Sequence, residues 1–311
     1  MSRAEPEPIS NVIRFKLTHS RDPTSGRKTT RQSQHSPSTD ANSESLRKVT
    51  QELEELQKMF NFFVPPEYQE LIALDGASKL QLGDTICKSI TVLFSDIRDF
   101  TTMSESMFIN DLMEFLNTYL AFALPPVAEH GGFIDKFIGD SIMCIFAKPD
   151  PVEQTIGAVN CAVRMMRNLD FMAESGFNPT ETGIGINTGR TIVGILGTET
   201  RMAPTALGDT VNLASRTESL CKRYGARILI TEYTKEKMGP QSEEQFTIRQ
   251  VDHVTVKGKS SACRMYEVID GDNAATQTLK KSILVEYNKG LEEFAQKYFD
   301  LALVSFNVSL N

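Results

Sequence analysis

The sequence predicts an α+β fold, with a ferredoxin-like sheet of βαββαβ order and helices on one face. From Ile90 onward, apolar runs typical of buried strands alternate with longer segments of helical periodicity. Residues 133–146 hold two apolar runs joined by Gly139-Asp140, which is typical of a β-hairpin. An antiparallel hairpin inside an alternating order of strands and helices indicates the α+β class.

The length, charge and cysteine content of the chain argue against several classes of function. The chain has 311 residues, 40% of them hydrophobic, which is enough for one sizeable domain with attachments. Its net charge of −7 argues against a nucleic-acid binder, which needs a basic face for phosphates. The five cysteines form no CxxC pair, so neither a disulfide framework nor a zinc site is expected. No apolar run reaches the roughly 20 residues of a membrane span and no signal peptide is present, so we expect a cytoplasmic protein.

Residues 1–45 differ in composition from the rest of the chain. Residues 18–45 are mostly Ser, Thr, Arg, Gln and Asp, and such a stretch buries too little apolar surface to offset the entropy of ordering. We therefore predict a disordered polar tail. A transit peptide is the alternative, because the tail is rich in Ser and Arg, but Glu5, Glu7 and Asp22 count against it.

A heptad seam predicts a dimerisation helix over residues 46–64. Its apolar positions recur at spacings of three and four: Leu46, Val49, Leu53, Leu56, Phe60 and Phe63. Pro65-Pro66 ends the helix, and residues 65–88 form a linker. About two and a half heptads leave two interpretations open. One is a dimeric coiled coil, which we favour, and the other is a single helix packed on its own domain.

The predicted central domain covers residues 89–270. Its expected strands are 90–96, 133–138, 141–146, 181–189 with a continuation over 191–197, 226–231, 246–258 and 263–269, and its expected helices are 108–129, 152–173 and 209–225. A helical tail is expected over residues 271–311, and Tyr287, Gly290, Phe294, Ala302 and Phe306 loosely match one tetratricopeptide repeat. One repeat cannot bury its own face. Either the tail docks on the central domain or the chain is a piece of something longer.

Asp96 and Asp140 are the first candidates for chemistry. Asp96 ends a buried strand and Asp140 lies in the hairpin turn, and either alone fits a turn or a helix N-cap. If the two strands are neighbours, however, both carboxylates converge at one edge of the sheet. Two such groups repel unless a cation neutralises them, and carboxylate oxygens suit Mg²⁺ or Mn²⁺.

Four cationic or amide side chains are candidates for ligand binding. Asn212 and Arg216 lie four apart on one helix face, where they are either solvated or able to bind a sugar and a phosphate. Lys136 precedes the hairpin turn and, taken alone, fits a surface group. Lys257, near Lys259 in a strand-to-strand turn, is a weak phosphate candidate. The sequence contains neither a P-loop nor a GxGxxG fingerprint.

Five strings together carry a family resemblance. VLFSDIRDFT, GGFIDKFIGDSIMCIF, GIGINTG, TALGDTVNLASR and VKGK resemble, in order and spacing, the catalytic domain of class III adenylyl and guanylyl cyclases, from about Ser89 to Ile269. FVPPEY and QLGD look like the region that introduces this domain in microbial members. The resemblance implies a head-to-tail homodimer with composite active sites at its interface.

The resemblance also implies a role for each candidate residue. In one protomer Asp96, Asp140 and the carbonyl of Ile97 would hold two Mg²⁺ or Mn²⁺ ions. The partner would supply the remaining groups: Lys136 and Thr205 for the purine, Asn212 for the ribose, Arg216 for the α-phosphate and Lys257 for the β- and γ-phosphates. The reaction implied is attack of the ribose 3′-hydroxyl on the α-phosphate with loss of pyrophosphate.

The purine-reading pair predicts the substrate. Lys136 can donate to adenine N1, an acceptor, whereas guanine presents a donor there. Lys136 with Thr205 therefore predicts ATP and an adenylyl cyclase. A threonine at position 205 resembles the cyanobacterial and soluble animal branch of the family. Members of that branch respond to bicarbonate, so regulation of this chain by bicarbonate is a hypothesis. The alternatives are a guanylyl cyclase, an inactive cyclase-fold dimer that signals, and a scaffold built on the helical tail.

Two positions depart from the family pattern. Asp99 replaces a glycine common in relatives and either adds a carboxylate near the metals or caps the following helix, which we favour. Ala203-Pro204 replaces an acidic-aromatic pair and is expected to stiffen a loop that carries Thr205. No sensor domain is recognisable in residues 1–64, so the heptad helix either transmits a signal from an upstream partner or only sets the dimer.

Overall fold

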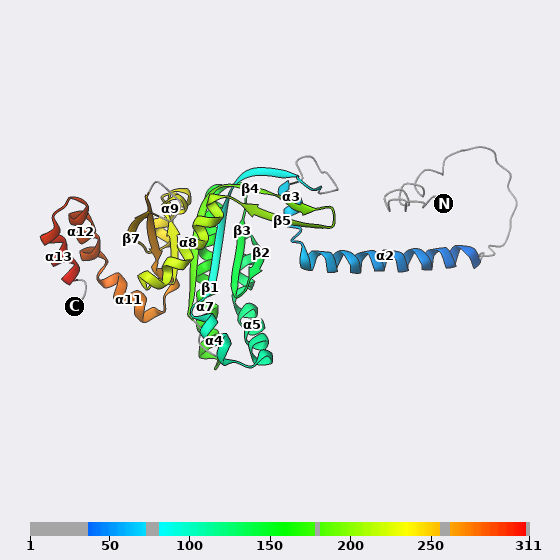
Figure 1. Ribbon diagram of the computed structural model, residues 1–311, viewed down its shortest axis with the longest axis horizontal. Coiled ribbons are helices and arrows are strands. Elements are labelled where there is room, and N and C mark those ends of the chain that lie inside the picture. The colour runs from blue at the N-terminus through cyan, green and yellow to red at the C-terminus, as the bar shows by residue number, and fades with distance from the viewer. Residues whose placement is uncertain (1–36, 73–80, 178–180, 256–261, 309–311) are drawn as a thin grey trace, which may run out of the picture. The chain divides into compact units, whose positions relative to one another are not determined.

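The computed structural model describes residues 37–72, 81–177, 181–255 and 262–308 (Figure 1). The predicted disordered tail lies outside the described residues as far as position 36. The chain divides into two compact units, residues 1–56 and 57–311, and each is described by itself. None of the described helices combines the length and apolar character that crossing a membrane requires.

Helix α2 (Pro37–Phe63) provides all the described residues of the first unit and ends in the second. It begins nine residues before the predicted boundary at Leu46, so the prediction of disorder was wrong for residues 37–45. Proline suits a first helical turn because the N–H that it lacks has no partner there. The seam side chains are exposed: Leu46, Val49, Leu53, Leu56, Phe60 and Phe63. The seam is thus accessible to a second chain, and the coiled coil stays a prediction.

The second unit is built on one mixed sheet. Its described strands are β1 (Thr85–Ile97), β2 (Gly132–Ile138), β3 (Ser141–Phe146), β4 (Thr182–Thr198), β5 (Arg201–Leu207), β6 (Ile228–Thr231), β7 (Ile248–Thr255) and β8 (Ala262–Val268). These strands run in the order β2-β3-β1-β4-β6-β8-β7, and β5 pairs with β4 (Figure 1). β1 is antiparallel to both of its neighbours, β3 and β4. The predicted βαββαβ order is confirmed from β1 to β4.

Helices cover both faces of the sheet. On one face lie α4 (Phe100–Ser106), α5 (Ile109–Ala123), α6 (Pro125–Glu129), α7 (Pro151–Glu174) and α9 (Glu232–Met238), whereas α3 (Glu67–Ile72) and α8 (Asp209–Tyr224) pack on the other. The prediction of helices on one face was therefore wrong. The second face admits α8 because β4 is glycine-rich. A Cβ on Gly185 would lie 2.1 Å from the backbone nitrogen of Glu218, in α8.

Two predicted segments differ from the structure in detail. The single helix expected over residues 108–129 is two helices, because Pro125 begins α6 directly after Leu124. The stretch that carries Thr205 is not a loop but strand β5, in which Pro204 lies opposite Ile195 of β4. Proline is tolerated there because, among the described strands, β5 pairs with β4 alone.

The C-terminal residues contact the sheet through two helices, the first of which carries Lys280, whose ammonium donates a 2.5 Å hydrogen bond to Glu267. After α10 (Ser242–Gln245) and the sheet's last strands come a 3₁₀ turn (Ile269–Gly271), α11 (Ala274–Ser282), α12 (Leu284–Ala295) and α13 (Phe299–Val308). The Tyr287 hydroxyl of α12 donates a 2.9 Å hydrogen bond to the carbonyl of Gln250 in β7. Gly290 allows α13 to approach, since a Cβ there would lie 2.7 Å from the Phe306 ring.

None of the five cysteines forms a disulfide bond among the described residues. Cys144, Cys161, Cys221 and Cys263 are buried, and only Cys87 is exposed. Burial raises the pKa of the Cys161 and Cys221 thiols to about 12, so both stay protonated at neutral pH.

Candidate active site

Pairing of β1 with β3 brings Asp96 and Asp140 together. Asp96 is the last residue but one of β1, and Asp140 lies in the turn between β2 and β3, where Gly139 has a φ of +66°. The Ser141 hydroxyl donates a 2.6 Å hydrogen bond to Asp96, and the Ile97 N–H donates a 3.2 Å hydrogen bond to Asp140. These contacts aim both carboxylates at one sheet edge.

The electrostatics of this aspartate pair fit a divalent cation. Burial raises the pKa of Asp140 to about 6, and the neighbouring Asp96 carboxylate adds to the rise. Two neighbouring carboxylates repel each other unless a cation neutralises them, and carboxylate and carbonyl oxygens are the ligands that Mg²⁺ and Mn²⁺ prefer. Among the described residues there is no cluster of three or more His, Cys, Asp and Glu side chains arranged to hold a metal.

Glu218 is an acidic neighbour that the sequence analysis missed. It lies on α8 against β4, where its carboxylate would be 2.9 Å from a Cβ on Gly183. Burial raises the pKa of Glu218 to about 7, and the charge of Asp96 contributes. The overlooked signal was a glutamate four residues after the buried Ala214, on the helix face that meets the sheet.

Replacing Glu218 by glutamine is expected to flatten the dependence of stability on pH. Because the pKa of Glu218 is raised from 4.5 to about 7, its contribution to stability is present below 4.5 and lost as the pH rises through 7. The comparison uses protein treated with EDTA. Between pH 5 and pH 8, the Tm of Glu218→Gln should fall by about 2–4 °C less than the Tm of the unaltered protein. A stability difference of about 1 kcal/mol produces a Tm shift of this size in a domain of this length. Thermal unfolding by circular dichroism measures it, and equal slopes for both proteins would contradict the assignment.

Lys136 and Thr205 meet on the second face of the sheet. Lys136 is on β2 and Thr205 is buried on β5, yet the Lys136 ammonium donates a 2.8 Å hydrogen bond to the Thr205 hydroxyl. The same ammonium lies 3.4 Å from the Asp135 carboxylate. The fold thus brings the ammonium of Lys136 and the hydroxyl of Thr205 together, although the two residues are 69 positions apart in the sequence.

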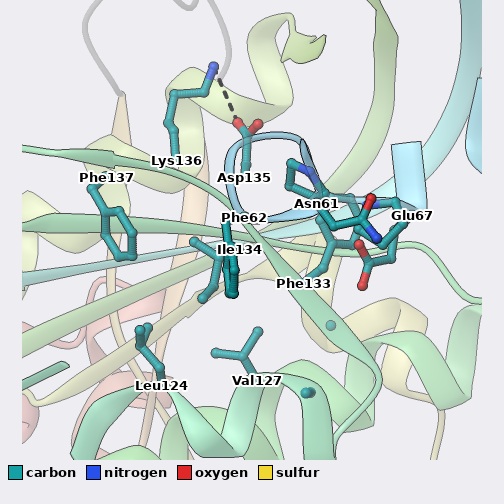
Figure 2. A pocket seen from close by; sticks show the side chains of 14 residues that line it. Asn61, Phe62, Glu67, Leu124, Val127, Phe133, Ile134, Asp135, Lys136 and Phe137 are labelled. Atoms are coloured by element: carbon teal, nitrogen blue, oxygen red, sulfur yellow. Dashed lines mark ion pairs between the residues drawn. The ribbon is translucent and has the colours of Figure 1, made fainter. Parts of the chain in front are cut away.

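A cavity of about 410 Å³ lies beside Lys136 (Figure 2). Its walls come from the end of α2, the start of α3, α6 and β2. Figure 2 shows Asp135 and Lys136 side by side at one side of it, with Ile134 nearer to Leu124 and Val127. The Tyr68 hydroxyl of α3 donates a 2.5 Å hydrogen bond to Asp135 from the same region.

Helix α8 presents Asn212 and Arg216 one turn apart. Gly208 precedes the helix with a φ of +134°, a conformation that favours glycine. The Asn212 side chain is exposed and Arg216 is half-buried. Neither side chain forms a hydrogen bond or ion pair with another described residue, so both donors are available to a ligand.

Lys257 and Asp99 are the two positions that remain. Lys257 lies outside the described residues, as does Lys259. Asp99 adopts a φ of +56°, in the left-handed region that favours glycine. Its carboxylate makes no capping hydrogen bond to α4, so the favoured capping role was wrong; it forms an exposed ion pair with Lys222 instead.

Comparison with protein families decides the membership. The model for the adenylate and guanylate cyclase catalytic domain matches residues 84–270. The chain belongs to this family. Members of the cyclase family use divalent metal ions, in agreement with the acidic pair at the sheet edge.

The most similar proteins include cyclases of both specificities. A terminal-differentiation-specific adenylate cyclase from Dictyostelium discoideum is 56% identical over 82% of this chain, but the chain spans only 12% of that protein's length. The adenylyl cyclase CyaB from P. aeruginosa is 34% identical, with a TM-score of 0.54 over 61% of this chain and 97% of that one. The guanylyl cyclase Cya2 is 32% identical, with a TM-score of 0.51 over 61% and 95%.

Proposed function

We propose that this chain is an adenylyl cyclase, which converts ATP to 3′,5′-cyclic AMP and pyrophosphate. The observation that supports the proposal is the contact between Lys136 and Thr205, because its ammonium is a donor of the kind that adenine N1, an acceptor, requires. The 56% identity to an adenylate cyclase supports the same substrate. The guanylyl cyclase alternative is opposed by Lys136, since guanine offers a donor at N1.

The proposed roles follow from the side chains at hand. Asp96, Asp140 and the Ile97 carbonyl would hold two Mg²⁺ or Mn²⁺ ions. Bound there, the ions would lower the pKa of the ribose 3′-hydroxyl and neutralise charge on the leaving pyrophosphate. The 3′-hydroxyl loses its proton to solvent water, and its oxygen forms a bond to the α-phosphorus while the bond from that phosphorus to the oxygen of the departing pyrophosphate breaks. No general base is assigned.

The other groups bind and orient ATP. Asn212 would hold the ribose, and Arg216 would direct its donors at the charge that grows on the α-phosphate. Lys257 would bind the β- and γ-phosphates. An inactive cyclase fold is opposed by the presence of both aspartates, Asn212 and Arg216.

A homodimer with composite sites is part of the proposal. Apolar side chains exposed on β2 and on the β4–β5 ribbon support a protein interface there: Phe137, Ile138, Ile192, Leu196, Met202 and Leu207. The exposed seam of α2 supports a parallel coiled coil that joins two chains, through which an upstream partner would act. The metal ligands would come from one protomer and the nucleotide-binding groups from the other.

Regulation by bicarbonate is a further part of the proposal, and it rests only on the threonine at position 205. Cyclic AMP formation by the purified protein should rise with bicarbonate at constant pH. A flat dose response would remove this part of the proposal and leave the adenylyl cyclase assignment untouched.

Cyclic AMP production by the purified protein tests the function. The protein should form cyclic AMP from Mn²⁺-ATP and Mg²⁺-ATP, and much less cyclic GMP from GTP. Preference for GTP would favour the guanylyl cyclase. Absence of product with either nucleotide and either metal would contradict the enzymatic proposal.

Exchange of the base-reading pair should change the substrate. Lys136→Glu with Thr205→Cys replaces a donor by an acceptor, which suits N1–H of guanine. The ratio of kcat/KM for ATP to that for GTP should fall at least about tenfold, roughly the worth of one hydrogen bond. Lys289→Glu, an exposed charge reversal on α12, is the control and should leave the ratio unchanged. A double variant that still uses only ATP would show that this pair does not read the base.

A further inference from the structure

Asp135 is a buried carboxylate with an incomplete set of partners. Its side chain is 1% exposed. One carboxylate oxygen accepts the 2.5 Å hydrogen bond from Tyr68, whereas Oδ2 accepts no hydrogen bond from any described residue. That Oδ2 lies 3.4 Å from the ammonium of Lys136. A buried carboxylate in this state costs free energy unless a nearby cation or hydrogen-bond donor compensates it, and the Lys136 ammonium is the cation beside it.

A β-bulge puts Asp135 beside Lys136. Ile134 pairs with Cys144 and Lys136 with Met143, so Asp135 is the extra residue of β2. In a regular strand, adjacent side chains point to opposite faces. The bulge removes this alternation and lets Asp135 and Lys136 point the same way, as Figure 2 shows.

Tyr68 ties this bulge to the segment that follows α2. It lies on α3, five residues after α2 ends at Phe63. Its ring is fully buried and packs edge-on against Phe133, with ring centroids 5.3 Å apart. Both ends of the contact are therefore held by packing, the ring by Phe133 and the carboxylate by the strand.

We propose that Tyr68 and Asp135 are positioning residues that hold the Lys136 ammonium in place to recognise adenine. The inference rests on the proposed adenylyl cyclase function. Lysine has a long, flexible stem, and without a fixed partner its ammonium samples many rotamers. Tyr68 fixes Asp135, Asp135 fixes Lys136 from one side, and Thr205 fixes it from the other.

This arrangement predicts which kinetic constant changes. Lys136 contacts the base, which is remote from the phosphorus that reacts, so its contribution is similar in the ground state and the transition state. Loosening Lys136 should raise KM for ATP and leave kcat nearly unchanged. It should also weaken discrimination against GTP, because a mobile ammonium no longer enforces an acceptor at N1.

The test is Tyr68→Phe, which removes the hydroxyl and keeps the ring. We expect KM for ATP to rise about fivefold with kcat within twofold, and the ATP to GTP ratio of kcat/KM to fall by a similar factor. Tyr287→Phe is the matched control, because it also deletes one tyrosine hydroxyl bond, in α12, and should change neither quantity.

A second variant keeps the inference testable if Tyr68→Phe folds poorly. Asp135→Asn preserves the shape and the bond from Tyr68 but removes the charge, and it should reproduce the same kinetic pattern. If Tyr68 acts through Asp135, the double variant should lose no more discrimination than Asp135→Asn alone. Active enzyme with unchanged KM and unchanged discrimination in both single variants would overturn the inference. Lack of cyclic AMP formation by the unaltered protein would instead overturn the proposed function.

Discussion

Replacement of Asp96 by asparagine is expected to lower cyclic AMP formation by about a thousandfold or more. The reason is loss of a charged oxygen ligand at the proposed metal pair, where several kcal/mol of charge stabilisation are at stake. Asparagine has the same shape, so the hydrogen bond from Ser141 can persist. A coupled assay with Mn²⁺-ATP measures the loss.

Stability separates loss of metal binding from misfolding. The Asp96 charge helps to raise the pKa of Asp140, so the metal-free variant should be at least as stable as the unaltered protein. Mn²⁺ should raise the Tm of the unaltered protein and leave that of Asp96→Asn nearly unchanged. Asp99→Asn is the control, since that exposed carboxylate pairs with Lys222, and its activity should stay within about twofold. Retained activity in Asp96→Asn would contradict the metal assignment.

Replacement of Arg216 by alanine should lower kcat by about 10²–10³ and change KM little. The guanidinium has no hydrogen bond or ion pair to the other described residues, so a structural role does not explain its place on α8. For the same reason the Tm of Arg216→Ala should match that of the unaltered protein. Steady-state kinetics with ATP and thermal unfolding together check both statements.

Two experiments sharpen the assignment of Arg216. Arg223→Ala removes an arginine from the last turn of the same helix, where it lies over the Tyr224 ring, and should leave kcat unchanged. Mixing Asp96→Asn with Arg216→Ala should restore about a quarter of full activity, because about half of the dimers are mixed and each has one intact site. Failure of the mixture to recover activity would argue against composite sites.

Much of the fold was predictable because periodicity and pairing rules act locally. The convergence of Asp96 and Asp140 followed from one assumption, that the first strand neighbours the hairpin, and β1 does pair with β3. Helix α7 was predicted to within a residue at each end because its apolar face is long and its start is marked by Asp150-Pro151.

The features that escaped prediction depend on contacts distant in sequence. A glycine in β4 does not reveal which helix will pack over it, so the place of α8 was missed. The strand character of residues 201–207 arises from pairing with β4, which local propensity does not encode. The link from Tyr68 to Asp135 spans 67 positions and depends on a bulge that no short pattern announces.

Because four of the five cysteines are buried, a thiol reagent can label the unaltered chain at a single residue. Cys87 is exposed on β1, opposite Ile192 of β4, whereas Cys144, Cys161, Cys221 and Cys263 are buried. A maleimide nitroxide or fluorophore should therefore attach at one position in each folded chain. Because Ile192 belongs to the proposed dimer interface, association of two chains should slow labelling at Cys87, which makes the thiol a reporter of dimer formation.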